Sequence, residues 1–416
     1  YADIIIKKGD KKTKAKLRIR GDSSRDFEKK SLKIKIEDPN SIYSKKTFNF
    51  NAEYTDQTFL RSYLSSSIFK KMNYPCFSTS FSNIYLNNKY YGLYLEVENI
   101  DKDFLIKNGL NKKGDLYKAT IDGACLYDTT EVKIKWEKKT NKNSCSKSLS
   151  KLINDLKNTD DDDFYSYIKE NFNYSKLIDF LAINAFIANG STYYHNYYLY
   201  RDFNNGGKWI LLPWDLDKTL SYYNWKPYKY HQTSSDWEND NPLIERCFHN
   251  RVIFSDFMQR INEIGDIINE DFYESIYNNA IKNLEQIILK DSTSKIKTIQ
   301  KWKKHIKNDK NFLNERSKNL IKDISLTPTG FKIHKLPHEI SLPFKISWDT
   351  SYNSKEYEIW ISKDFLYTDS LTYKFTTKNN SYCIDSLPLG SYYWKVIAKN
   401  KYSYNTGFNS KNNFNL

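Results

Sequence analysis

Hydrophobic and polar residues alternate along the first hundred positions in a pattern that predicts β-strands. The segments KAKLRIRG (14–21) and KSLKIKIED (30–38) have period two, and FSNIYLNNKYYGLYLEVENI (81–100) has the pattern of a hairpin. Between them, TFLRSYLSSSIFKKMN (58–73) carries its apolar residues at helical spacing. The pattern therefore predicts a small β-rich lobe that contains a helix.

The middle of the chain, from about residue 147, has mostly helical periodicity. SKLIDFLAINAFIAN (175–189) predicts a buried helix, and residues 243–325 predict amphipathic ones. NYYLYRD (196–202) and KWILLPWD (208–215) predict two short strands joined by a turn. The acidic run NTDDDD (158–163) lacks the ligand spacing and the glycine of a calcium loop, so a helix start is favoured there. We predict a larger helical lobe with a β-hairpin near its start.

The last part of the chain changes character at SLTPTGFKIHKLPHE (325–339), a boundary marked by prolines. Beyond it, short alternating segments predict a β-sandwich. Leu387, followed by Tyr393 and YWKVIA, resembles the tyrosine corner of a fibronectin type III-like domain. We predict two domains, 1–325 and 328–416.

Composition adds a basic balance to this picture. The 416 residues contain 65 Lys and Arg against 50 Asp and Glu, a formal net charge of +15. Such a charge suits a polyanionic partner, and the alternative is solubility combined with the codon bias of an AT-rich genome. Five scattered cysteines argue against a disulfide framework or a zinc site. The sequence contains no run of 18 apolar residues, so it predicts no membrane span. We expect any signal or anchor to lie upstream of Tyr1.

Candidate chemistry lies around the predicted hairpin. Phosphoryl transfer needs groups that hold phosphates, ligands that hold Mg²⁺ and a group that orients the nucleophile. In protein kinases, a loop Asn lies five residues after the catalytic Asp, and a hairpin then leads to a metal-binding Asp. Asn196 and Asp215 have this arrangement, and Asp217 follows. Ser191 stands five residues before Asn196, where the catalytic Asp is expected.

The turn in RIRGDSSRDFEKKSLKIKI (18–36) is the second candidate. Its hydroxyls, backbone N–H groups and guanidinium groups suit a triphosphate, and Lys30 or Lys33 on the second strand could reach back to the phosphates. The alternative is a basic hairpin that is simply solvated.

Several segments taken together resemble the spore coat protein H (CotH) kinase family. The resemblance covers most of residues 15–225 and continues more weakly to about 325. It rests on LRIRGDSSRDFEKKSLKIKI (17–36), NIYLNNKYYGLYLEVENID (83–101), GDLYKA (114–119), HNYYLYRD (195–202) and KWILLPWDLDKTL (208–220).

The resemblance implies an atypical protein kinase that uses ATP and Mg²⁺ (or Mn²⁺) to phosphorylate Ser or Thr, typically on spore coat proteins. We therefore expect an α+β chain with a bilobal kinase-like fold followed by an all-β fibronectin type III-like sandwich. Matched by position, the inter-lobe hinge falls near Glu98 to Ile100. The phosphate-binding residues are Arg20, Ser23, Ser24, Arg25 and Lys30, and the metal residues are Asn196 and Asp215, with Asp217 as a possible second ligand or a residue that shapes the loop.

Ser191 departs from the family pattern, because the catalytic Asp of an N-x-D motif matches NGS at 189–191. A serine cannot take up the substrate proton at neutral pH, and general-base help is worth ~10²–10⁴-fold. Three interpretations stay open: a nucleotide-binding pseudokinase, slow transfer that relies on metal and electrostatics, or replacement by another acid or by His195. A working kinase is the favoured interpretation.

Other function classes fit less well. Basic and aromatic residues are not interleaved on one predicted sheet face, so no nucleic-acid partner is expected. Glycosidase chemistry needs two facing carboxylates, but Asp215 and Asp217 on an extended segment would point to opposite faces. A structural coat protein would explain the sandwich but not the kinase-like spacing. We expect a nucleotide and an acceptor protein as partners, on the spore coat or the cell surface of a spore-forming bacterium.

Overall fold

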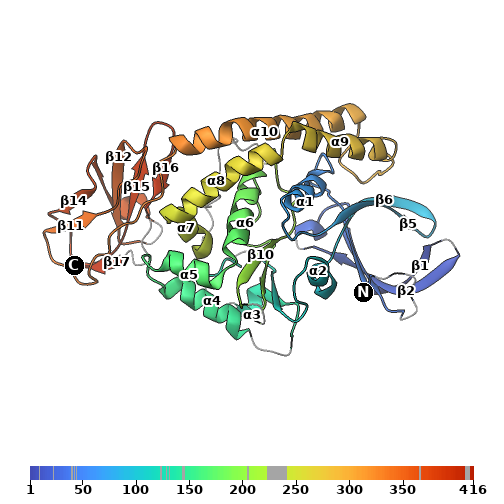
Figure 1. The fold of residues 1–416 in the computed structure, drawn as a ribbon, viewed down its shortest axis with the longest axis horizontal. Helices are drawn as coiled ribbons and strands as arrows, with labels where there is room; N and C mark the ends of the chain where they lie inside the picture. The colour runs from blue at the N-terminus through green and yellow to red at the C-terminus, as the bar shows by residue number, and fades with distance from the viewer. Residues whose placement is uncertain are drawn as a thin grey trace.

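The chain folds into a small β-rich lobe, a larger helical lobe and a final all-β region, as Figure 1 shows from right to left. The predicted α+β class and this order of regions are confirmed. The computed structural model describes residues 1–8, 10–21, 23–38, 41, 43, 45–121, 124–127, 129–130, 132–142, 146–203, 206–222, 241–364, 367–407 and 413–416.

The small lobe is an antiparallel sheet of six strands in the order β1-β2-β3-β4-β6-β5. The strands are β1 (Ala2–Lys8), β2 (Lys11–Arg20), β3 (Ser31–Ile36), β4 (Thr47–Asn51), β5 (Thr79–Leu86) and β6 (Lys89–Val97). The period-two pattern has its expected effect, because Leu32 and Ile34 of β3 are buried, whereas Lys33 is half-buried and Lys35 exposed. Helix α1 (Arg61–Lys71) packs against β5.

The helical lobe contains a second sheet, in the order β10-β9-β7-β8. Helix α6 is buried from Leu177 to Phe186, which explains its continuous apolar sequence. The elements of this lobe are α2 (Lys102–Lys107), β7 (Asp115–Ala119), α3 (Val132–Lys135), β8 (Trp136–Lys138), α4 (Lys147–Asn158), α5 (Phe164–Asn171), α6 (Tyr174–Phe186), β9 (Tyr197–Arg201), β10 (Trp209–Pro213), α7 (Pro242–His249), α8 (Arg251–Ile267), α9 (Glu270–Leu284) and α10 (Ile299–Leu326).

The C-terminal region has its own hydrophobic core, separate from that of the two lobes. Two antiparallel sheets are consistent with the predicted sandwich, and its fibronectin type III-like identity stays a prediction, as do the domain limits. The expected tyrosine corner involves Tyr392 rather than Tyr393: Tyr392 is buried and its hydroxyl donates to the Pro388 carbonyl at 2.6 Å. The elements are β11 (Phe344–Ser347), β12 (Glu356–Ser362), β13 (Thr372–Thr377), β14 (Ser381–Ile384), β15 (Ser391–Lys399), β16 (Tyr404–Thr406) and β17 (Asn413–Asn415).

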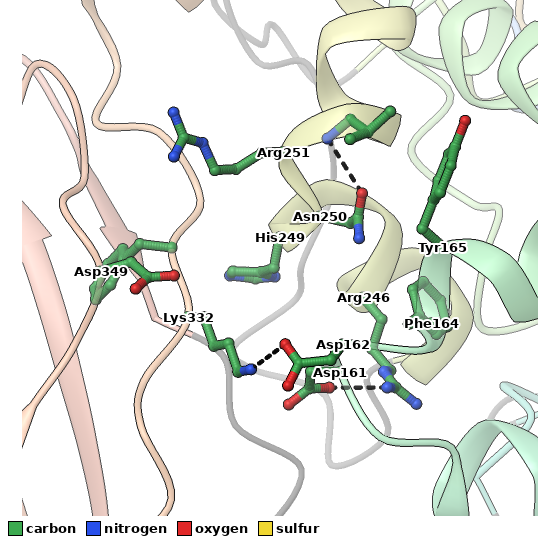
Figure 2. A pocket seen from close by; sticks show the side chains of 12 residues that line it. Asp161, Asp162, Phe164, Tyr165, Arg246, His249, Asn250, Arg251, Lys332 and Asp349 are labelled. Atoms are coloured by element: carbon green, nitrogen blue, oxygen red, sulfur yellow. Dashed lines mark hydrogen bonds and ion pairs between the residues drawn. The ribbon is translucent and has the colours of Figure 1, made fainter.

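The acidic run joins the helical lobe to the C-terminal region. Helix α5 begins directly after the run, as predicted, with Asp163 at its N-cap position. Asp162 forms an ion pair with Lys332 at 2.5 Å, and Asp160 pairs with Lys335. A cavity of about 370 Å³ lies at this junction (Figure 2). Its charged residues pair largely with one another, so we assign it to the packing of the two regions and not to catalysis.

No helix within the described ranges is long and apolar enough to cross a membrane.

Candidate functional site

The β9–β10 hairpin brings the predicted metal residues to one end of the second sheet. Tyr197 pairs with Pro213, so Asn196 and Asp215 both lie just beyond this last pair. Both residues have left-handed backbone torsions, with φ of 60° and 55°. Asn and Asp tolerate this region better than other non-glycine residues, which helps to explain their presence at this end of the hairpin.

A third carboxylate, from the small lobe, joins the two predicted ones. Glu53 follows β4, is buried, and has a φ of 45°, an unfavourable torsion for glutamate. Burial raises the pKa of Glu53 well above its ordinary value, and the Asp217, Asp56 and Asp215 carboxylates raise it further. Burial and the neighbouring Asp215 raise the pKa of Asp217 to about 8. Glu53 is buried and Asp215 and Asp217 are half-buried, so they form an acidic cluster that disfavours the ionisation of Glu53 and Asp217.

Short side chains of the small lobe fix two members of this acidic cluster. The Ser62 hydroxyl donates to Glu53 Oε2 at 3.0 Å. The Thr55 hydroxyl donates to Asp217 Oδ2 at 3.3 Å, across the interface between the lobes. Asp217 is therefore oriented by the segment between β4 and α1, and Glu53 by the first turn of α1.

The predicted metal residues offer two carboxylates and one amide as oxygen donors. In the described part of the chain, no three His, Cys, Asp or Glu side chains converge closely enough to hold a metal ion. Mg²⁺ is usually held by one or two carboxylates, while waters and substrate phosphates supply the other ligands. Two acids and an amide at the end of one hairpin match that requirement.

A cluster of cations lies beside these acids. Burial lowers the pKa of Lys33 to about 8, and Lys139, Arg20 and Arg18 lower it further. Burial also lowers the pKa of Lys118 to about 8, and Arg20 and Lys139 add to that effect. Because neighbouring cations lower the pKa values of Lys33 and Lys118, the cluster is electrostatically suited to an anion.

Trp214 connects the cation cluster to the acidic one. The guanidinium of Arg20 and the ammonium of Lys118 each lie 5.5 Å from its ring centroid. Phe77 and Tyr198 pack edge-on against the same ring, at 5.4 and 5.6 Å. Burial lowers the pKa of Arg20, whereas the Asp215 carboxylate opposes that effect. Positive and negative groups therefore meet at Trp214 and Asp215.

The predicted phosphate-binding turn is only partly included in this arrangement. Arg20 belongs to the cation cluster and donates to Asn51 Oδ1 at 2.5 Å. Ser23 to Arg25 form a 3₁₀ turn, in which Arg25 is exposed and Ser24 half-buried. The Lys30 ammonium donates to the Arg25 carbonyl at 2.5 Å. No contact found among the described residues joins Ser24, Arg25 or Lys30 to the acidic cluster, and the Ser23 side chain lies outside the described ones.

The neighbouring Lys29 has a structural partner. Its ammonium forms an ion pair with Asp291 at 2.8 Å, with both side chains almost fully buried, and donates to the Leu93 carbonyl. Asp291 also accepts the Leu93 N–H at 3.0 Å. This pair ties the small lobe to the segment between α9 and α10.

Glu98, predicted near the hinge, lies between β6 and α2. Although burial raises the pKa of Glu98, hydrogen bonds from the Ser78 N–H and from Lys107 outweigh that effect and lower it. The distances are 2.8 Å to the Ser78 nitrogen and 3.0 Å to the Lys107 ammonium. Its contacts are therefore those of a residue that fixes the backbone between the lobes.

Ser191 lies next to Asp215, one of the predicted metal residues, and is fully buried. Its hydroxyl donates to the Asp215 backbone carbonyl at a long 3.5 Å, and its N–H donates to Asn189 Oδ1 at 3.2 Å. Its contacts support the loop around Asp215. His195 is half-buried, with its ring 4.3 Å from that of Tyr194.

A hollow of about 820 Å³ shares Lys139 with the cation cluster. Its other lining residues are Lys102, Asp115, Thr140, Asn141, Lys142 and Phe203. Its size falls in the range of small-molecule sites, and Lys102 lies two residues beyond the predicted hinge.

The sequence did not indicate Glu53, Lys118 or Lys139 as site residues. Lys118 lies within GDLYKA, one of the segments that carry the family resemblance, and this was the available signal. Glu53 stands in a polar stretch before α1 and has no local motif to mark it.

Comparisons with known proteins agree with the resemblance. The family model described as CotH kinase protein matches residues 17–320. Inner spore coat protein H of Bacillus subtilis (strain 168) is 29% identical over 223 residues, which are 52% of this chain and 61% of that protein. The chain thus spans about three fifths of that relative's length. The crystal structure of the Helicobacter pylori proinflammatory kinase CtkA is 12% identical, with a TM-score of 0.38, and covers 70% of this chain and 92% of that one.

Proposed function

The chain belongs to the CotH kinase protein family, and from that premise we propose that it is an ATP- and metal-dependent protein kinase. In this proposal, it transfers the γ-phosphoryl group of ATP to Ser or Thr residues of a spore coat or surface protein. The name of the Bacillus relative supports a location in the spore coat.

The observation that carries the proposal is the meeting of opposite charges at Trp214 and Asp215. Cations with lowered pKa values stand on one side, and on the other are the buried Glu53 and the half-buried Asp217, whose pKa values are raised. A phosphate anion would reduce the repulsion among the cations, and a divalent cation would reduce the repulsion among the carboxylates. A metal–triphosphate complex carries both charges in one ligand, and phosphoryl transfer depends mainly on such electrostatic stabilisation.

Each group has a role in this proposal. Asn196, Asp215 and Asp217 would hold Mg²⁺, and the bound metal would neutralise charge on the transferring phosphoryl group. Arg20 and Lys118 would hold phosphate oxygens, since both flank Trp214. Lys33 and Lys139 would add positive charge at longer range. The hollow that includes Lys102 and Lys139 offers room for the remainder of the nucleotide.

The second candidate is a nucleotide-binding pseudokinase, favoured by Ser191. A buried hydroxyl that donates to a backbone carbonyl cannot serve as a base. In the kinase proposal, the chain instead transfers phosphate without that base, because positioning and charge stabilisation supply most of the acceleration.

A transfer assay with γ-³²P-ATP and Mg²⁺ or Mn²⁺ separates the two candidates. It compares the parent, Asp215→Ala, Ser191→Asp and the matched control Asp26→Ala, which removes an exposed acid. Label in the parent and in Asp26→Ala that disappears in Asp215→Ala supports a working kinase. Label only in Ser191→Asp, or ATP binding without label, supports the pseudokinase. Absence of both label and ATP binding contradicts both candidates.

A further inference from the structure

The loop that carries the two metal-binding acids is anchored at its far end by helix α10. This loop, residues 215–222, is called the metal-site loop below. The Ser221 hydroxyl donates to Asp309 Oδ1 at 2.5 Å, and the Ser221 N–H lies 3.4 Å from the same oxygen. Asp309 lies in α10 and is completely buried. An element near the end of the family-matched region thus reaches directly into the loop that carries Asp215 and Asp217.

Arg61 completes this anchor from the small lobe. It is the first residue of α1, and its side chain is almost fully buried. Its Nε and Nη2 lie 3.1 and 3.2 Å from the two Asp309 carboxylate oxygens, a bidentate arrangement, and Nη2 lies 3.4 Å from the Ser221 hydroxyl. Its Nη1 lies 3.4 Å from Asp56. The single guanidinium group therefore contacts α10, the metal-site loop and the segment before α1.

Two further contacts connect the metal-site loop to the same segment of the small lobe. Thr55 donates to Asp217, and the Ser65 hydroxyl lies 2.9 Å from that of Thr219. The segment from Glu53 to Ser65 thus contributes a carboxylate to the acidic cluster and also holds the loop that supplies the other two. The loop is enclosed between α1 and α10 and is held there by directional polar contacts.

We infer that Arg61, Asp309 and Ser221 are positioning residues that fix the metal-site loop in the geometry that binds the metal. This inference rests on the proposed function. A buried ion pair adds little stability compared with a well-packed apolar replacement, but it restricts its surroundings to one arrangement of hydrogen bonds. Partners that orient metal ligands typically change metal affinity or activity ~10–100-fold when they are removed.

The opposing interpretation is that the three residues only stabilise the fold. Ser221→Ala separates the two, because it removes one hydroxyl and leaves the Arg61–Asp309 pair in place. Ser275→Ala is the matched control, since Ser275 is an exposed residue of α9 whose hydroxyl donates to the Phe272 carbonyl at 2.8 Å. Asp309→Asn is a second variant, which keeps the shape of the side chain and removes its charge.

The experiment measures the Mg²⁺ concentration for half-maximal phosphoryl transfer, the ATP affinity without metal, and amide hydrogen exchange across residues 216–222. In Ser221→Ala we expect the Mg²⁺ requirement to rise roughly tenfold. ATP affinity without metal should change less than about twofold, and amide exchange of Leu220 and Ser221 should become faster. Asp309→Asn should show the same pattern more strongly, whereas Ser275→Ala should match the parent.

Parent-like Mg²⁺ dependence and parent-like exchange in Ser221→Ala would overturn the inference. Equal losses of metal-dependent and metal-independent ATP binding would also overturn it, since they indicate a stability effect only. If the parent itself neither transfers phosphate nor binds ATP, the proposed function fails. The exchange measurement then tests the anchor separately, because it requires no activity.

Discussion

Replacing Asp217 by Asn should stabilise the ligand-free protein while it weakens the binding of metal. Asp217 is half-buried in the acidic cluster, where desolvation and Asp215 raise its pKa to about 8. A carboxyl group whose pKa is raised on folding contributes stability below its unfolded pKa. That contribution is lost as the pH rises through the folded pKa. The parent should therefore lose stability between about pH 4 and pH 8, and Asp217→Asn should lose less.

The magnitude follows from the difference between the two pKa values. A rise from 3.8 to about 8 corresponds to a ceiling of about 6 kcal/mol, at about 1.4 kcal/mol per pH unit. The carboxyl groups of Glu53 and Asp217 interact, so Glu53 bears part of this destabilisation. That part remains in the Asp217→Asn variant. We therefore expect Asp217→Asn to increase the free energy of unfolding by about 2–4 kcal/mol at pH 8.5 and by less than about 1 kcal/mol at pH 4.5.

Urea unfolding at these two pH values, without nucleotide or metal, tests this expectation. Asp26→Asn is the control, because Asp26 is exposed and the substitution makes the same change in net charge. It should leave the unfolding free energy within about 0.5 kcal/mol of the parent at both pH values. A gain in Asp217→Asn that is equal at both pH values, or no gain at pH 8.5, would refute the assignment of Asp217 to a strained acidic cluster.

Three further variants test other residues of the site. Lys118→Met should weaken ATP binding about tenfold, since it removes a charge-assisted phosphate contact. Calorimetric titration of ATP measures this change. Unchanged ATP affinity would exclude Lys118 from the site. Lys29→Met should lower the free energy of unfolding by about 3 kcal/mol or more, because Asp291 is left buried and without its Lys29 partner. The ATP affinity of the folded protein should stay the same. Denaturant unfolding measures the first effect, and the ATP titration measures the second. Ser191→Ala should keep the rate of phosphoryl transfer within about threefold of the parent, since it loses only one long hydrogen bond. A decrease of more than about tenfold in the radiolabel assay would indicate that Ser191 is catalytic.

Much of the architecture could be predicted because its signals are local. The period-two segments 14–21 and 30–38 became β2 and β3, which pair from Ala15 with Ile36 to Arg20 with Ser31. The end of the β9–β10 hairpin could be predicted as well. Once two strands pair across a short turn, the residues that flank them must meet. The proximity of Asn196 and Asp215 follows from this.

The rest of the site depends on contacts between distant segments. Glu53 joins the site only when the two lobes pack, and Lys118 only when β7 pairs with β9. No spacing in the sequence encodes either contact. Lys29 and Lys30 show the same limit at adjacent positions. One is buried against Asp291 and the other contacts the local Arg25 carbonyl, so a shift of one residue changes what a side chain faces.

The acidic run at 160–163 shows how a sequence signal can be correct but incomplete. Its place before a helix was predictable from charge, because acids favour a helix N-terminus. Its pairing with Lys332 and Lys335 depends on where the C-terminal region docks. The sequence alone does not contain that information.

The most direct test of the central claim is a calorimetric titration of ATP, with and without Mg²⁺, into the parent and into Asp215→Ala. We expect Mg²⁺ to raise the ATP affinity of the parent at least tenfold, because the acids and the cations hold one metal–nucleotide complex together. In Asp215→Ala, most of this metal-dependent gain should be lost, while weak binding without metal remains. ATP binding in the parent that is absent, or that is the same with and without Mg²⁺, would contradict the account.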